Sequence, residues 1–92
     1  VDALITAPSE GLYRCHMPEG IADFRDLESA AFHAESEIGQ RARPAADAIG
    51  AIDIRLKIER HDEVVRAADG TATFIECRLS AVASGRPALA TD

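Results

Sequence analysis

The most constraining feature of this sequence is the strict alternation of apolar and charged residues between positions 52 and 59. The apolar positions are Ile52, Ile54, Leu56 and Ile58, and the charged positions are Asp53, Arg55, Lys57 and Glu59. Successive side chains of a β-strand point to opposite faces, so this pattern predicts a strand with one buried face. We expect the rest of the chain to fold around this strand.

The residues that follow predict a hairpin. A polar segment covers 59–63, after which two valines restart a β-branched run that ends at Asp69-Gly70, a strong turn signal. We therefore expect two β-runs folded back on each other, with 59–63 at the hairpin tip. Lys57 would lie on the shoulder of that tip and project away from the apolar face. Such a lysine is either an attachment point for a swinging prosthetic group or an ordinary solvated strand residue.

Length and charge narrow the class of protein. The 92 residues fit one domain, 1–92. The net charge of -6 argues against a nucleic-acid surface, because phosphate binding requires clustered lysine and arginine. No apolar run approaches the roughly 20 residues of a membrane span, and no basic segment precedes an apolar one at the start. We therefore expect an acidic cytoplasmic protein that binds neither nucleic acid nor membranes.

The cysteines and histidines do not form a recognisable site. Cys15 and Cys77 are expected to be free buried thiols, because the chain is long enough to fold without a bridge and shows no export signal. Together with His16 and His33 they match no spacing that defines a metal site. The sequence also lacks a Ser-His-Asp set, a carboxylate pair or a phosphate loop, so we expect neither a metal nor a catalytic residue.

The N-terminal half predicts two strands and a helix. Short β-type runs at 4–7 and 12–15 flank the turn-forming segment 8–11. Over 21–34 the apolar residues share one arc of a helical wheel, which predicts a helix of about three turns. The apolar residues on this arc are Ile21, Phe24, Leu27, Ala31 and Phe32. We expect the two phenylalanines to pack the helix onto the sheet, with contact to a partner as the alternative.

The C-terminal half predicts connectors and further strands. Residues 36–44 read as a turn-rich connector, and 45–49 fits either a helix or a loop. A clear strand covers 71–79, a turn follows at 84–87, and a last short run covers 88–91. The strand-turn segment 5–11 is echoed by 65–70, and this repeat indicates a β structure with two pseudo-symmetric halves.

Taken in order, these segments resemble the biotinyl/lipoyl carrier domains, in particular biotin carboxyl carrier proteins. The matching segments are APSEGLYRC, IGQRARPAADAIGAIDI and LKIERHDEVVRAADGTATFIECRLSAVASGRPAL. The resemblance implies an all-β flattened barrel, the barrel-sandwich hybrid, built of two halves. It also implies that the helical insertion at 21–34 acts as a lid, a docking element or a packing element.

The resemblance places a biotin attachment site at Lys57, which lies between Leu56 and Ile58. In the family two methionines flank this lysine, and both are absent here. The hairpin is also longer than the family pattern, and counting back from Gly70 would put Glu59 at the attachment position. The resemblance thus makes Lys57 a candidate for covalent biotin, although its neighbours and the hairpin length depart from the family pattern.

Three functions follow as expectations. The first is a non-catalytic carrier domain or subunit of a biotin-dependent acyl-CoA carboxylase-like complex, with the complex's enzyme subunits or a biotin ligase as partners. The second is an unmodified, degenerate carrier-like module with a structural or regulatory protein-interaction role. The third is a small α+β domain of another kind, in which the resemblance is accidental.

Overall fold

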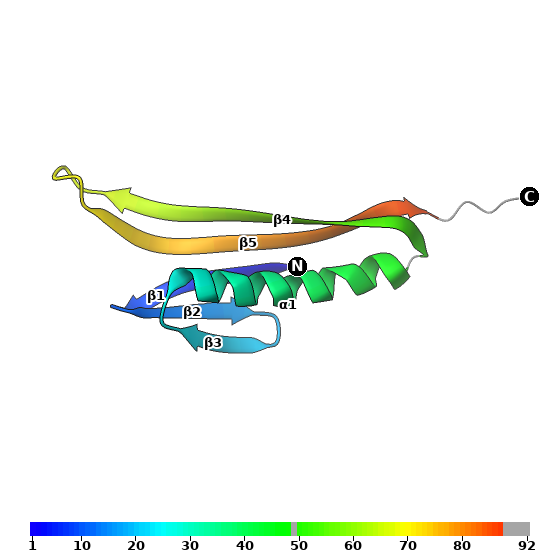
Figure 1. The fold of residues 1–92 in the computed structure, drawn as a ribbon, viewed down its shortest axis with the longest axis horizontal. Helices are drawn as coiled ribbons and strands as arrows, with labels where there is room; N and C mark the ends of the chain where they lie inside the picture. Colours follow the sequence, from blue (N-terminus) through cyan, green and yellow to red (C-terminus); the bar gives the residue numbers. More distant parts are fainter. Residues whose placement is uncertain (49, 88–92) are drawn as a thin grey trace, which may run out of the picture.

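The computed structural model describes residues 1–48 and 50–87 of the chain and folds them into one sheet and one helix (Figure 1). In chain order the elements are β1 (Asp2–Ser9), β2 (Leu12–Met17), β3 (Gly20–Phe24), α1 (Leu27–Ala48), β4 (Ala51–Arg66) and β5 (Ala72–Pro87). The five strands are antiparallel and lie in the order β3-β2-β1-β5-β4. Helix α1 packs against one face of this sheet.

The chain is mostly antiparallel β-sheet, with 61% of it in strands, but the expected flattened barrel of two halves is wrong. Over the residues that the structure describes, β3 and β4 are the two edges of an open sheet. A barrel buries its apolar side chains inside a closed sheet, whereas here α1 covers the apolar face. A helix on one face removes the need for closure.

The first hairpin agrees with the prediction from the sequence. The strands expected at 4–7 and 12–15 lie within β1 and β2, whose register pairs Ile5 with Cys15. The turn between them contains Gly11 with φ of 72°, a left-handed conformation that glycine adopts at low cost.

The helix expected over 21–34 is wrong at both ends. Its first residues form β3, and the helix begins at Leu27 because the carboxylate of Asp26 caps it. That carboxylate accepts hydrogen bonds from the backbone N–H of Ser29 at 2.8 Å and from the Ser29 hydroxyl at 2.8 Å. The spacing of Ile21 and Phe24 fits one turn of a helix, but it also fits a short strand.

Helix α1 continues through 36–44, which was expected to be a connector, and it contains Pro44. The reason is an apolar stripe at four-residue intervals that faces the sheet. The buried residues of this stripe are Ala30, Ala34, Ile38 and Ala42. Burial of the stripe outweighs the low helix propensity of Gly39 and Pro44.

The hairpin tip expected at 59–63 is also wrong, because these residues continue β4 and pair with β5. The turn lies further on, where the N–H of Gly70 donates to the carbonyl of Ala67 at 3.0 Å. The turn signal at Asp69-Gly70 was therefore correct. Likewise 84–87, expected to turn, continue β5, and the predicted run at 88–91 lies outside the described residues.

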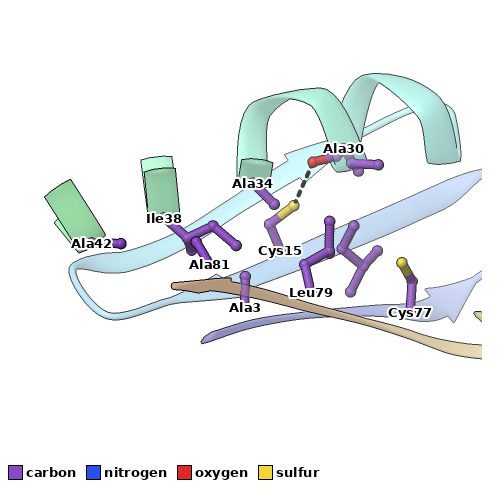
Figure 2. Packing of buried hydrophobic residues seen from close by; sticks show 11 residues of the cluster. Ala3, Cys15, Ala30, Ala34, Ile38, Ala42, Cys77, Leu79 and Ala81 are labelled. Atoms are coloured by element: carbon purple, nitrogen blue, oxygen red, sulfur yellow. Dashed lines mark hydrogen bonds between the residues drawn. The ribbon is translucent and has the colours of Figure 1, made fainter. Parts of the chain in front are cut away.

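The core lies between α1 and the three central strands β1, β2 and β5 (Figure 2). Its largest fully buried side chains are Ile5, Cys15, Ile38, Cys77 and Leu79. Alanines supply most of the rest, so the helix can approach the sheet closely. Both cysteines are free and buried, as predicted.

The molecule is long for its size. It measures 66 × 27 × 15 Å with a radius of gyration of 16.9 Å, against about 12 Å for a compact chain of this length. The cause is the hairpin of β4 and β5, which extends beyond β1, β2 and β3 (Figure 1). Among the described residues, no helix has the length and apolar character that crossing a membrane requires.

Candidate functional site

Lys57, the predicted attachment site, lies within β4 rather than beside a hairpin tip. It is paired in register with Val82 of β5, and its side chain is 75% exposed. Its ammonium group lies 2.9 Å from the Glu59 carboxylate, so the two positions considered for attachment form an exposed ion pair on one strand. Biotin attachment at Lys57 stays a prediction.

Strand β4 is a long edge of the sheet. Over the described part of the chain, its only neighbouring strand is β5. Residues directly opposite each other in an antiparallel pair share a face. Ile58 lies opposite buried Ala81, and Arg60 lies opposite buried Leu79, so both belong to the face that α1 covers. The alternate residues of β4, such as Glu59 between these two, point to the open face.

The helix covers the apolar face of β4 only in part. Leu56 remains 44% exposed and Ile58 37% exposed, and Phe32 on the outer side of α1 is 73% exposed. The expected burial of this face is therefore incomplete, and the expected packing of Phe32 onto the sheet is wrong. Phe24, by contrast, packs against the core and lies with its ring centre 5.1 Å from that of His33.

These exposed side chains line a groove between α1 and β4, which we call the outer groove. It encloses about 400 Å³ and is lined by Phe32, Glu35, Ser36, Gly39, Gln40, Arg43, Leu56 and Ile58. At Gly39 the helix comes close to the strand, since a Cβ built there would lie 3.2 Å from Cδ2 of Leu56. The groove thus runs directly beside the free edge of β4.

Arg60 ties β4 to the start of α1. Its guanidinium donates to the Glu28 carboxylate at 3.0 and 3.1 Å and to the Asp62 carboxylate at 2.9 and 3.0 Å. The hydrogen bonds to Glu28 and then to Asp62 raise the pKa of Arg60, and the bonds from Arg60 lower the pKa of both carboxyl groups. The position of the edge is therefore fixed by ion pairs at one end of the outer groove.

The opposite face of the sheet is open. A shallow hollow of about 810 Å³ there is lined by side chains that include His16, Arg78 and His61. The strand order puts His16 and His61 three strands apart, which corresponds to about 14 Å. That separation is too large for a direct proton relay between the two imidazoles. Among the described residues, no three His, Cys, Asp or Glu side chains cluster to hold a metal.

The thiols offer no reactive group. Burial raises the pKa of Cys15 to about 11 and that of Cys77 to about 12. The Cys15 thiol also donates a hydrogen bond to the carbonyl of Ala30 at 3.2 Å (Figure 2). Both groups are protonated at neutral pH, and a thiol is a poor nucleophile. Their role is packing.

The chain matches no family model, no curated protein and no solved structure. The function is therefore argued from geometry, and the feature that sequence reasoning missed is the combination of a free β4 edge with Phe32. A signal was present in the sequence. The alanine stripe that begins at Ala30 marks the buried side of α1, and Phe32 falls off that stripe.

Proposed function

We propose that this chain is a non-catalytic protein-interaction module that accepts an extended strand along the outer edge of β4. The observation that carries the proposal is the exposed apolar groove beside a 16-residue edge strand. Free backbone groups on such an edge pair readily with another strand, and proteins normally keep exposed edge strands short or covered. An edge this long is the natural site for a partner strand.

The arrangement has both parts that strand addition requires. Main-chain hydrogen bonds along β4 would supply affinity, and side-chain contacts would supply specificity. Phe32 is a large apolar side chain left in solvent beside Leu56 and Ile58, and aromatic side chains of this kind anchor interfaces. The charged residues of β4 on the open face would select the partner and its register.

Photo-crosslinking in the cells that make the protein tests this function. The photoreactive residue p-benzoylphenylalanine would be placed at position 32, with position 21 on β3 as the matched control, since Ile21 is also exposed on an edge strand. We expect one crosslinked species of defined mass from position 32 and none from position 21. Absence of any adduct at position 32 would contradict the proposal.

A second candidate function is the biotin carrier, and the observation that favours it is the exposure of Lys57. Attachment there would let the domain carry an intermediate for the enzyme subunits of an acyl-CoA carboxylase-like complex, after loading by a biotin ligase. Intact-mass spectrometry after co-expression with a biotin ligase tests it. The carrier function predicts one added biotin that is lost in Lys57→Arg, and an unmodified chain would remove it.

A further inference from the structure

We propose that the strand added to β4 is β4 of a second copy of this chain, in an antiparallel pairing with its two-fold axis at Ile58. This inference rests on the proposed interaction function and names its partner. Identical edge strands related by a two-fold axis perpendicular to the sheet pair antiparallel, and both helices stay on the same side. Residues equally far before and after the axis residue then face each other.

The charges of β4 decide among the possible registers, because like charges directly opposite each other destabilise a strand pair. An axis at Leu56 puts Arg55 opposite Lys57 of the second copy. An axis at Lys57, Glu59 or Arg60 puts that residue opposite itself. Each of these four registers therefore brings two like charges together.

An axis at Ile58 removes this conflict. Lys57 of each copy then faces Glu59 of the other, which gives two opposite-charge pairs on the open face. In the single chain Lys57 lies opposite Val82, and Glu59 lies opposite Ser80, so neither has a charged neighbour directly across β5. Within each chain Lys57 and Glu59 already form an exposed ion pair with each other, and the pairing with a second copy adds an oppositely charged residue directly across the edge from each.

The same register brings the second copy to the outer groove. On the helix face, Ile58 of one copy meets Ile58 of the other, and Leu56 of each copy lies opposite Arg60 of the other. Adjacent strands are about 4.8 Å apart, so β4 of the second copy lies directly beside the Leu56 and Ile58 side chains that line the groove. Phe32 projects from α1 on the groove side, next to the place that the added strand takes.

A break in β4 limits the pairing at one end. The register of β4 against β5 shifts between Ile52 and Arg55, and Asp53 has φ of 55°. Such a bulge turns the strand edge away from a straight ladder. The paired segment is therefore 55–61, which spans about 24 Å.

Charge reversal tests the register. Sedimentation velocity over a wide range of protein concentration should show a dimer of the wild-type chain. Lys57→Glu and Glu59→Lys should each weaken dimerisation by roughly tenfold or more, because each creates two like-charge pairs. The double variant should return to within a few-fold of the wild type. Arg66→Glu makes the same charge change outside the paired segment and should leave dimerisation unchanged.

Each outcome is decisive. A wild-type chain that stays monomeric at every concentration, or a double variant that fails to recover, overturns the inference. If the chain is monomeric but position 32 crosslinks to a different protein, the second copy is excluded and the interaction function stands. If the chain is monomeric and position 32 forms no adduct, both fail. Circular dichroism of each variant shows whether its fold is intact.

Discussion

Two leucines on neighbouring strands show how differently a central strand and an edge strand of this sheet are buried. Leu79 on β5 is 1% exposed, whereas Leu56 on β4 is 44% exposed. Both are in the same hairpin and on the same face of the sheet. The difference comes from sheet order, since β5 lies between β1 and β4 while β4 is an edge. Burial therefore depends on where a strand lies in the sheet, and not only on its apolar pattern.

The comparison also separates stability from recognition. The region around β1, β2 and the middle of β5 packs small side chains under α1 and holds the core. The outer side of β4 keeps large apolar side chains in partial contact with solvent. We infer that the first region holds the fold together and that the second is available to a partner.

The largest effect on stability should come from a substitution in the buried core. Leu79→Ala removes a fully buried side chain and should lower the free energy of unfolding by about 2–5 kcal/mol. Leu56→Ala, the same change at the edge, should cost about 1 kcal/mol or less. Urea unfolding at low protein concentration measures both. Equal costs would show that the edge is as well packed as the core.

The next largest effect on stability should come from the ion pairs that link β4 to α1. Arg60→Gln removes the ion pairs that join β4 to Glu28 of α1 and should cost about 1 kcal/mol. The control is Arg78→Gln, because the Arg78–Glu76 pair lies within β5 alone and is exposed. Thermal unfolding and amide exchange in β4 report the change. If the two variants behaved alike, Arg60 would not position the edge.

The helix cap gives a smaller, pH-dependent effect. Hydrogen bonds from Ser29 lower the pKa of Asp26 in the folded chain. Ionised Asp26 therefore stabilises the fold above about pH 4, and this contribution is lost as the pH falls through the lowered value. Asp26→Ala should lower Tm by a few degrees at pH 7. The difference in Tm should close at acid pH, and a difference that persisted there would exclude the cap.

The smallest effect tests how closely α1 approaches β4. Gly39→Ala should raise the free energy of unfolding by about 0.5 kcal/mol, because alanine favours the helix while the exposed tip of Leu56 moves aside. In a Leu56→Ala background the gain should reach about 1 kcal/mol, the full difference in helix propensity. Identical gains in both backgrounds would mean that the helix and Leu56 do not touch.

The sequence predicted the local elements better than their arrangement. Short β-type runs and turn residues identified β1, β2 and part of β5, period-2 alternation identified the first part of β4, and the free buried thiols were expected correctly. The segment 59–63 was misread because a strand at a sheet edge tolerates charged residues on both faces, which hides its periodicity. The barrel was wrong because local patterns do not specify whether a helix or a second sheet layer covers an apolar face.

The candidate site was predicted only in part. Lys57 was correctly placed on a strand, facing away from the apolar side, but the structure leaves its attachment role untested. The free edge of β4 depends on strand order, which involves residues far apart in the sequence. Phe32 was assigned to the buried side because the predicted helix began too early and its wheel included residues that belong to β3.

Amide hydrogen exchange measured at several protein concentrations tests the central claim most directly. The account predicts that amides within 55–61 gain protection as the concentration rises, while those of β1 stay strongly protected throughout. The added protection should be absent in Lys57→Glu and present again in the double charge reversal. Exchange in 55–61 that did not depend on concentration would contradict the claim that this edge pairs with a second copy.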